Sequence, residues 1–387
     1  MTADRTTRPG WLSSPRPGVR RMRVLPVLEP HRGALEKCVF CPKLCRTACP
    51  VSNAEPRETL TPWGKMTGAW SVAHGDVPLA PSHADPMWAC TGCFGCRELC
   101  EHVNPVADVL LDARAALAAA GVLPAGARRV VRRFAAHEAA ARDGALALAS
   151  HPRVDPDAPD ALLIGCGYVR GAPGAARDAV DAAAAVTGRS IALVEGCCGL
   201  PLRLAGDALG FKAHAAAFAR SVAGRARVVV VDAGCALTLR RRFEQAAVVL
   251  APRVELLVEL ASGAPPGRPV RSDGPVRWHD PCQLGRGLGV YAAPRAVLQG
   301  LLGRPPDEFL ARGAGAVCSG AGGLLPSTMP TVAAAIARAR VQQHVEAGGG
   351  RIVTGCAASL LALRRAGRRS GVVVEDLVSW IARAAPR

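Results

Sequence analysis

Residues 90–100 read Cys-Thr-Gly-Cys-Phe-Gly-Cys-Arg-Glu-Leu-Cys, so four cysteines are separated by two, two and three residues. An earlier run at residues 38–50 has four more cysteines, separated by two, three and three residues and followed by Pro50. A 4Fe-4S cluster needs four converging thiolates, and three closely spaced cysteines let one tight loop supply three of them. The two runs therefore predict two 4Fe-4S clusters.

The spacing also predicts which cysteines share a cluster. In proteins with two such clusters, the fourth cysteine of a run binds the cluster of the other run. The first run has one extra residue before its third cysteine, and Glu101 stands where a proline usually follows the second run, but neither change removes a ligand. Structural zinc and disulfides are the less favoured alternatives, because zinc motifs usually pair two Cys-x2-Cys units. The predicted ligand sets are Cys38, Cys41, Cys45 and Cys100 for the first cluster, and Cys90, Cys93, Cys96 and Cys49 for the second.

The N-terminal segment predicts the compartment. Residues 1–30 are rich in arginine and proline and have no continuous apolar stretch like that of a signal peptide. Arg20-Arg21 is followed only by a short apolar stretch that a proline interrupts, which argues against twin-arginine export. We therefore expect the reducing cytoplasm, with any membrane association peripheral and through a partner, since no segment approaches the length of a transmembrane helix.

Length and charge narrow the classes of function. The chain has 387 residues, of which half are hydrophobic, enough for about two to three domains. The formal net charge of +17 comes almost entirely from arginine, and aromatic residues make up only 4% of the chain. A nucleic-acid groove would interleave basic and aromatic residues, so we expect no nucleic-acid partner. The charge suits a solvated surface or an acidic protein partner.

Hydrophobic patterning divides the chain further. Residues 106–120 and 127–143 are predicted helices, and the proline- and aspartate-rich residues 151–159 a linker. The predicted parts are an extended arm (1–34), an α-helical ferredoxin-like two-cluster domain (35–124), a helix and linker (125–160), and two α/β repeats (161–262 and 275–387).

Within both repeats, short apolar runs alternate with alanine-rich helical segments, as in parallel α/β units. The strand candidates are residues 161–165, 191–195 and 228–232 in the first repeat and 276–280, 316–318 and 351–355 in the second, with helices expected at 294–302 and 330–347.

The remaining cysteines support an internal repeat. Each lies at the end of a predicted strand or in the loop after it, the edge where open α/β sheets place ligands. The separation between Cys197 and Cys318 equals that between Cys235 and Cys356. The first repeat has Cys166, Cys197, Cys198 and Cys235; the second has Cys282, Cys318 and Cys356.

These loops resemble a known family. Cys-Cys-Gly-Leu-Pro at 197–201, His-Asp-Pro-Cys at 279–282 and Cys-Ser-Gly-Ala-Gly-Gly at 318–323 are similar to the cysteine-rich CCG repeats. Such repeats occur in proteins like the D subunit of heterodisulfide reductase and in the iron–sulfur subunits of glycolate oxidase and the lactate-utilisation complex. The resemblance implies an electron-transfer subunit whose CCG cysteines hold a further iron–sulfur centre or zinc.

The two repeats differ in how well they match the CCG pattern. All four positions of the first repeat are cysteine, which implies a metal site there. In the second repeat Ser319 replaces one cysteine of the pair, and Thr238 and Ser359 stand where the fullest version of each repeat has another cysteine. The second repeat could bind a cluster completed by Ser319 or His279, bind zinc, or hold packed thiols only. We expect His279 to be a structural histidine oriented by Asp280.

No flavin, nicotinamide or hydrolytic motif is present, so substrate oxidation is expected on a partner chain. The favoured partner is an FAD-dependent dehydrogenase for glycolate or lactate, or a membrane electron-carrier protein. This chain would then relay electrons to quinone or another carrier. A catalytic subunit of a heterodisulfide-type reductase is the alternative, and a non-redox scaffold with metal staples is a third.

Overall fold

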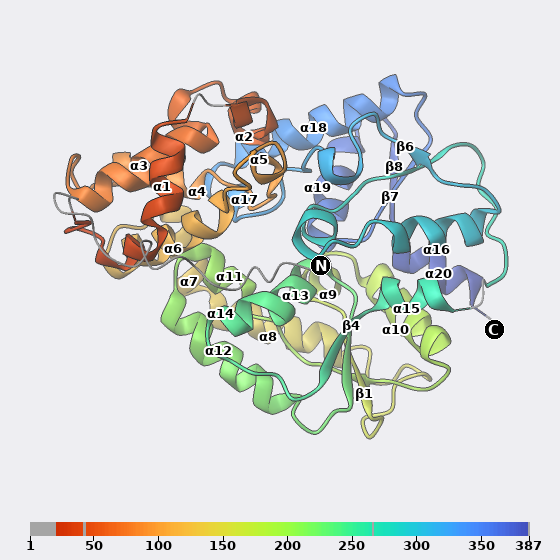
Figure 1. Cartoon of the computed structure of the whole chain (residues 1–387). Helices are drawn as coiled ribbons and strands as arrows, with labels where there is room; N and C mark the ends of the chain where they lie inside the picture. Colours follow the sequence, from red (N-terminus) through yellow and green to blue (C-terminus); the bar gives the residue numbers. More distant parts are fainter. Residues whose placement is uncertain (1–20, 42–43, 265–266, 386–387) are drawn as a thin grey trace, which may run out of the picture.

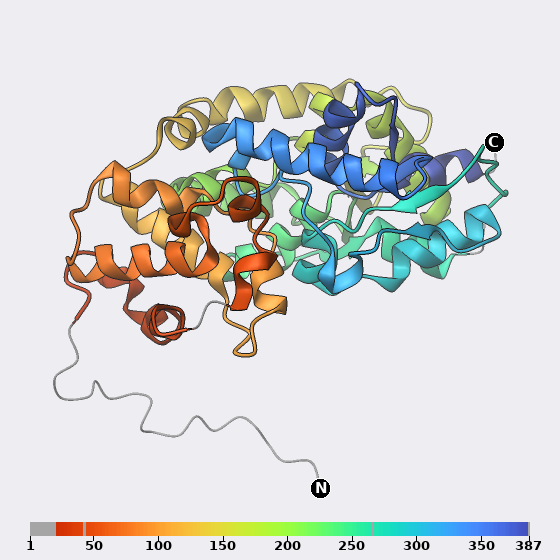
Figure 2. The ribbon, with the colours of Figure 1, turned by 90° about the horizontal axis from the view of Figure 1, so that it is seen from above.

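A computed structural model describes residues 21–41, 44–264 and 267–385. The chain forms a helical domain and two α/β repeats, drawn from red to yellow, from yellow to green, and from cyan to blue in Figure 1. Figure 2 shows the helical domain at one end of the molecule and the repeats at the other. The predicted fold class is confirmed. Among the described helices, none is both long enough and apolar enough to cross a bilayer.

Local chemistry sets the ends of the helices in the helical domain, as α3 illustrates. The side chain of Thr61 accepts a hydrogen bond from Gly64 N, Pro62 stands in the first turn, and Gly75 ends the helix with φ at 79°. These residues suit an N-cap, a first turn and a left-handed C-cap, respectively. The helices are α1 (Arg32–Val39), α2 (Pro50–Ala54), α3 (Pro62–His74), α4 (Pro81–Trp88), α5 (Gly95–Glu98) and α6 (Val106–Ala119).

The start of the described chain differs from the extended arm that the sequence predicts. Residues 1–20 of that arm lie outside the described residues. From Met22 onward the chain packs on the helical domain: a 3-10 helix spans Pro26–His31, and Met22, Leu25 and Leu28 are buried. These three side chains join the same hydrophobic core as Met66 of α3 and Val109 of α6, which is why this segment docks rather than extends.

Two helices connect the helical domain to the repeats where the sequence predicts one. They are α7 (Ala125–Arg132) and α8 (Phe134–Leu146), and the break lies at Arg133. Helix α7 packs against α11 (Leu200–Ala205) and α17 (Leu325–Thr328), whereas α8 packs against α9 (Cys166–Gly171). The break follows from these different neighbours, which patterning along one segment does not reveal.

Each repeat contains a four-stranded parallel sheet. The strand order is β2-β1-β3-β4 in the first repeat and β6-β5-β7-β8 in the second, so the two repeats share one topology. Helices cover both faces, which is why a strand such as β3 has a valine run buried along its length. The strands are β1 (Asp160–Leu163), β2 (Ala192–Leu193), β3 (Arg227–Val230), β4 (Arg253–Leu256), β5 (Val276–Trp278), β6 (Asp307–Glu308), β7 (Arg351–Thr354) and β8 (Val373–Asp376). The remaining helices are α10 (Pro173–Thr187), α12 (Ala208–Ser221), α13 (Ala233–Leu237), α14 (Phe243–Gln245), α15 (Leu257–Gly263), α16 (Ala292–Leu302), α18 (Pro330–Glu346), α19 (Ala357–Gly367) and α20 (Leu377–Ala384).

The strand predictions fail at three places. Residues 316–318 form no strand, and the edge position beside β5 belongs to β6 instead. Ala316 and Cys318 are buried, so the apolar signal there reports burial in a loop. Strands β4 and β8 were not predicted, because each is short and two of its four residues are charged, as in an exposed segment.

The carboxyl edges of the two sheets face each other. The Asp232 carboxylate, after β3, accepts a hydrogen bond from Ala357 N, after β7, at 2.9 Å. The Tyr168 hydroxyl donates to Asp376 across the same interface at 2.7 Å. One continuous hydrophobic core contains residues of both repeats. The cysteine-bearing loops therefore meet in the middle of the molecule.

A buried arginine joins the helical domain to both repeats. The Arg114 guanidinium, on α6, donates hydrogen bonds to the carbonyl oxygens of Met87 and Cys90 at 2.9 and 2.8 Å. It also donates to Leu204 O of the first repeat at 3.2 Å and to Gly323 O of the second at 2.9 Å. This one side chain thus fixes the second cysteine run against both repeats.

Candidate metal centres

Five cysteines of the two runs line one cavity of about 120 Å³ in the helical domain. One is Cys96, and the other four, called here the first dicluster site, are Cys38, Cys41, Cys45 and Cys100. Asn104 lines the same cavity, and its Nδ2 donates a hydrogen bond to Cys38 Sγ at 3.0 Å. Burial raises the pKa of Cys38 to about 12, and the Asn104 hydrogen bond opposes that rise. A neutral donor therefore points at a sulfur of this site.

The other four cysteines of the runs line a second, smaller cavity. They are Cys49, Cys90, Cys93 and Cys96, called here the second dicluster site. Burial raises the pKa of Cys90 and of Cys96, because removal from water penalises a thiolate. Lys65 is buried beside this site, and its Nζ donates to Cys49 Sγ at 3.4 Å. Ligand thiolates here would need a compensating cation, which a metal cluster supplies.

The structure brings together the two sets of four cysteines that crossed ligation predicts. Cys49 lies at the second site rather than with its own run, and Cys100 lies at the first. Cys96 lines both cavities, so the two sites are adjacent. His102 lines the first cavity but is exposed.

The second repeat reaches the second dicluster site directly. The thiols of Cys93 and Cys318 are hydrogen-bonded to each other, and Cys318 is also hydrogen-bonded to Cys282. Arg286 lies in the same place, where its Nε donates to Cys93 O at 2.6 Å. Cys356 is instead hydrogen-bonded to Ser359. Two of the three second-repeat cysteines, Cys282 and Cys318, are therefore neighbours, and Cys318 also contacts the helical domain.

His279 is not hydrogen-bonded to Asp280, the partner that the sequence suggests. Its Nδ1 accepts a hydrogen bond from Arg340 Nε at 3.3 Å, and burial lowers its pKa to about 3. Asp280 instead binds Arg295 through both carboxylate oxygens at 2.8 Å. The expectation that Asp280 orients His279 is wrong, because Arg295 takes up that carboxylate.

The four cysteines of the first repeat form a continuous group, called here the first-repeat site. Cys166 Sγ and Cys197 Sγ lie 3.5 Å apart, Cys197 is hydrogen-bonded to Cys198, and Cys198 to Cys235. The hydrogen bond from Cys197 lowers the pKa of Cys166 to about 6, and the hydrogen bonds from Cys197 and Cys235 lower that of Cys198. The pKa values of Cys197 and Cys235 are raised, because these thiols donate. Thiolate charge is thus favoured on Cys166 and on the buried Cys198, and a bound metal would neutralise such charge.

The secondary structure explains how these thiols converge. Cys166 begins α9 after β1, Cys197 and Cys198 follow β2, and Cys235 lies in α13 after β3. The Asp232 carboxylate caps α13 by accepting from Gly234 N at 2.8 Å and from Cys235 N at 3.2 Å. Adjacent parallel strands thus deliver their loops to one edge of the sheet.

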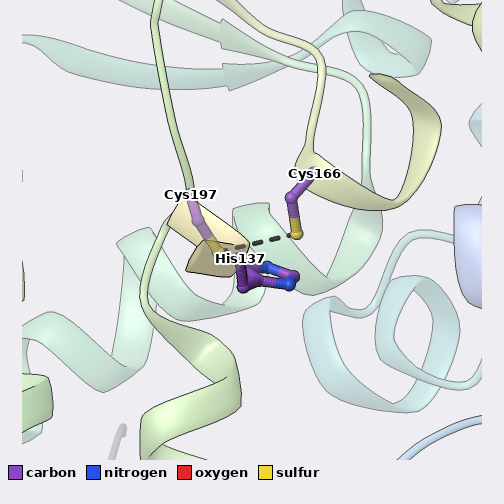
Figure 3. A group of neighbouring side chains, drawn as sticks. All are labelled: His137, Cys166 and Cys197. Atoms are coloured by element: carbon purple, nitrogen blue, oxygen red, sulfur yellow. Dashed lines mark hydrogen bonds between the residues drawn. The ribbon is translucent and has the colours of Figure 1, made fainter. Parts of the chain in front are cut away.

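One residue at this site could not be found from the sequence. A ring nitrogen of His137, on α8, and the sulfurs of Cys166 and Cys197 all lie within 4.8 Å of one another. Figure 3 shows the imidazole ring beside both sulfurs. His137 belongs to no cysteine motif and precedes the repeat, so only the packing of α8 on α9 brings it here. The four thiols fit a metal centre at this site, as does the buried Nε2 of His137, for which the described residues offer no oxygen or nitrogen partner.

Comparisons with known proteins agree with this domain organisation. The 4Fe-4S dicluster domain matches residues 34–103, and the cysteine-rich domain called CCG matches residues 161–240 and again 276–364.

Similar proteins extend over most of the chain. The D subunit of the dihydromethanophenazine:CoB–CoM heterodisulfide reductase of Methanosarcina barkeri is 25% identical over 90% of this chain and 94% of its own. The B subunit of the fumarate reductase (CoM/CoB) of Methanothermobacter marburgensis is 22% identical over 89% of this chain and 70% of its own. An uncharacterized iron–sulfur protein of Methanocaldococcus jannaschii is 31% identical over 33% of this chain and 24% of its own. The chain thus joins a 4Fe-4S dicluster domain to two cysteine-rich CCG domains.

Proposed function

We propose that this chain is the iron–sulfur electron-transfer subunit of an oxidoreductase complex. It would relay electrons between a partner flavoprotein of the glycolate- or lactate-dehydrogenase type and a quinone or other carrier. The observation that carries the proposal is the direct contact between the second repeat and the second dicluster site, where Arg286 Nε donates to Cys93 O at 2.6 Å and the thiols of Cys93 and Cys318 are neighbours. Two relatives that are similar over most of the chain are named as reductase subunits, which supports an oxidoreductase with partner subunits.

The chemistry divides between this chain and its partner. A 2-hydroxy acid that becomes a 2-oxo acid releases two electrons and two protons, and a quinone takes up two of each to become a quinol. A bound 4Fe-4S cluster supplies one-electron transfer. The chain's own thiolates would hold the clusters, and Asn104 and Lys65 would each donate a hydrogen bond to a ligand sulfur.

An alternative function is catalysis of disulfide reduction at the first-repeat site. The reaction RS–SR′ + 2e⁻ + 2H⁺ → RSH + R′SH requires a centre that accepts electrons singly and meets a substrate sulfur. The joined thiols of Cys166, Cys197, Cys198 and Cys235 favour such a centre, as does the name of the Methanosarcina barkeri relative. The serine at position 319 argues mildly against it.

An assay with chemical donors separates the two functions. The purified chain, kept anaerobic, is reduced with a viologen radical and offered either a small disulfide or a water-soluble quinone. It is then tested again with a 2-hydroxy acid and an FAD-dependent dehydrogenase in place of the viologen. Electron flow from the hydroxy acid to quinone supports the relay. Disulfide reduction by the chain alone supports the alternative, and electron transfer to neither acceptor contradicts both.

A further inference from the structure

His137 is held in one particular tautomer at the first-repeat site. Arg170 Nη1 lies 2.6 Å from His137 Nδ1. A guanidinium group donates hydrogen bonds and cannot accept them, so Nδ1 must be the acceptor. A neutral imidazole then carries its single proton on Nε2.

His137 Nε2 is buried, and among the described residues no oxygen or nitrogen atom accepts its proton. A hydrogen bond from His137 is instead one of the causes that lower the pKa of Cys166. A buried N–H without an acceptor loses its hydration without compensation. With Nδ1 held by Arg170, Nε2 is the ring nitrogen that remains for an interaction with Cys166 and Cys197 (Figure 3).

We propose that His137 donates an Nε2–H hydrogen bond to a sulfur of the metal centre at the first-repeat site. That sulfur is the thiolate of Cys166 or Cys197, or a sulfide of the bound centre. His137 is thus a positioning residue rather than a metal ligand. The inference rests on the proposed function in one respect, the presence of a redox centre at this site.

Such a hydrogen bond has a measurable consequence. Reduction adds negative charge to the sulfurs, so a donor stabilises the reduced form and raises the reduction potential. Loss of the donor is expected to shift the reduction equilibrium about tenfold, which is 59 mV for a one-electron couple. Direct ligation through Nε2 would instead require the ring proton to move to Nδ1, opposite the donor Arg170.

The test compares His137→Phe with His137→Gln by anaerobic potentiometric titration followed by EPR. The imidazole stacks on Phe134 with ring centroids 5.9 Å apart, so phenylalanine preserves packing while removing the donor. For His137→Phe we expect unchanged iron content. The reduction potential of the first-repeat centre should fall by the amount that corresponds to about a tenfold change in the reduction equilibrium constant. His137→Gln, which retains an N–H donor, should recover part of the shift. His102→Phe, at an exposed histidine, is the matched control and should change nothing at this site.

The possible results separate the inference from the proposed function. An unchanged potential in His137→Phe overturns the hydrogen bond. Strong ¹⁵N-histidine coupling in the wild-type EPR signal, with iron lost in His137→Phe and in His137→Gln, overturns it in favour of direct ligation. A wild-type protein with no first-repeat signal overturns both this inference and the redox centre on which it rests.

A separate observation concerns the two dicluster sites: buried cations gather at only one of them, among the residues that the structure describes. Lys65 Nζ contacts Cys49 Sγ at 3.4 Å, Arg114 Nη2 contacts Cys90 O at 2.8 Å, and Arg286 Nε contacts Cys93 O at 2.6 Å. All three cationic side chains are buried.

The first dicluster site has no comparable charge within the described part of the chain. Its sulfur donor is the neutral amide of Asn104. Lys37 lines its cavity, but it is exposed and shares that cavity with the opposite charge of Glu101. Exposed charges are screened by water and salt, whereas buried charges act at a much lower effective dielectric constant.

From this asymmetry we infer that the second dicluster site has the higher reduction potential. Buried positive charge stabilises a site when it gains an electron. An electron that enters at the first dicluster site is therefore drawn inward, toward Cys93 and its neighbour Cys318 in the second repeat. This gives the proposed relay a favoured direction, from the helical domain to the repeats.

Substitution of Lys65 tests this order. Lys65→Met removes the charge at similar length, and we expect it to lower the potential of the second dicluster site by about tenfold in equilibrium constant, or 59 mV. Lys65→Arg should retain the wild-type potential. Asn104→Leu should shift only the first dicluster site, which assigns the two signals, and Lys37→Met should shift neither.

Two results would contradict the order of potentials. One is a first dicluster site that titrates at the higher potential in the wild-type protein. The other is a Lys65→Met variant with both potentials unchanged. A protein without two cluster signals would contradict the proposed function together with this inference.

Discussion

The hydroxyl oxygens of Ser319 and Ser359 lie 2.9 Å apart in the buried interior of the second repeat. Both serines stand at positions where the CCG pattern has cysteine in its fullest form. In the first repeat the matching residues are Cys198 and Thr238, and the Thr238 hydroxyl donates to Gly234 O at 2.7 Å. In the second repeat a hydrogen-bonded pair of hydroxyls therefore occupies the positions of a possible pair of thiols.

The serine pair leads to a gain-of-function prediction. Ser319→Cys combined with Ser359→Cys should give the second repeat additional metal, because thiolates bind iron and zinc more strongly than neutral hydroxyls do. Iron and zinc per chain are measured after anaerobic reconstitution. The matched control is Ser319→Ala with Ser359→Ala, which removes the hydroxyls without adding thiols. Equal metal content in the two double variants would contradict this expectation.

Substitution of Cys198 tests how many metal centres the protein holds. Cys198→Ser should lower the iron content of the purified protein by the amount held at the first-repeat site and leave the two dicluster signals unchanged. Two 4Fe-4S clusters correspond to about eight irons, and a third four-iron centre raises the total to about twelve. Iron and sulfide quantitation with EPR of the reduced and thiol-oxidised protein provides the measurement. About eight irons in both proteins would show that the first-repeat thiols are structural or bind zinc.

Gly323 allows a test of domain docking. It has a positive φ of 63°, and a Cβ there would lie 2.0 Å from the carbonyl oxygen of Cys90. Gly323→Ala should separate the second repeat from the second cysteine run and weaken the hydrogen bond from Arg114. We expect a loss of about 2 kcal/mol or more in the free energy of unfolding, the range for strained backbone and unpaired buried groups.

Limited proteolysis and thermal unfolding would measure that loss. Gly315→Ala is the control, since a Cβ at that position would meet no atom within 4 Å. Equal unfolding midpoints for the two variants would argue against a docking role for the close contact at Gly323.

The buried carboxyl group of Asp376 should make the stability of the protein depend on pH. Burial raises the pKa of its carboxyl group to about 7, and hydrogen bonds from Tyr168 and Val378 N partly oppose that rise. An unfolded chain has the ordinary value of about 3.9, so the folded protein holds a proton that the unfolded protein releases between about pH 4 and 7. This contribution to stability is complete below about pH 4 and is lost as the pH rises to about 7, at up to about 1.4 kcal/mol per pH unit.

Asp376→Asn should remove this dependence, because an amide does not titrate and still accepts at a helix N-cap. The unfolding free energy of the variant relative to wild type should increase from about pH 4 to about pH 7 and level off above that range. Urea unfolding at fixed pH values measures it. A difference between the two proteins that stays constant across this range would contradict the prediction.

Local patterns account for much of what could be predicted. The helix expected at residues 106–120 is α6, because its apolar spacing is set within one segment. The predicted strands beginning at residues 228 and 351 correspond to β3 and β7, whose valine and isoleucine residues are buried in parallel sheets. The failures share a cause. Residues 316–318 are apolar because they are buried in a loop, and the helix expected at residues 127–143 breaks at Arg133 because its halves pack on different neighbours.

The cysteine chemistry of this protein is encoded in short stretches of its chain. Cysteine number, spacing and repetition already predict two clusters, crossed ligation and a stronger metal site in the first repeat, since these depend on residues close together in the sequence. What surrounds those thiols depends instead on three-dimensional packing. His137, Lys65 and Arg286 reach their sulfurs and carbonyl groups through the packing of separate elements, and no local pattern encodes such contacts. Burial then amplifies their charges and hydrogen bonds, because the interior screens them far less than water does.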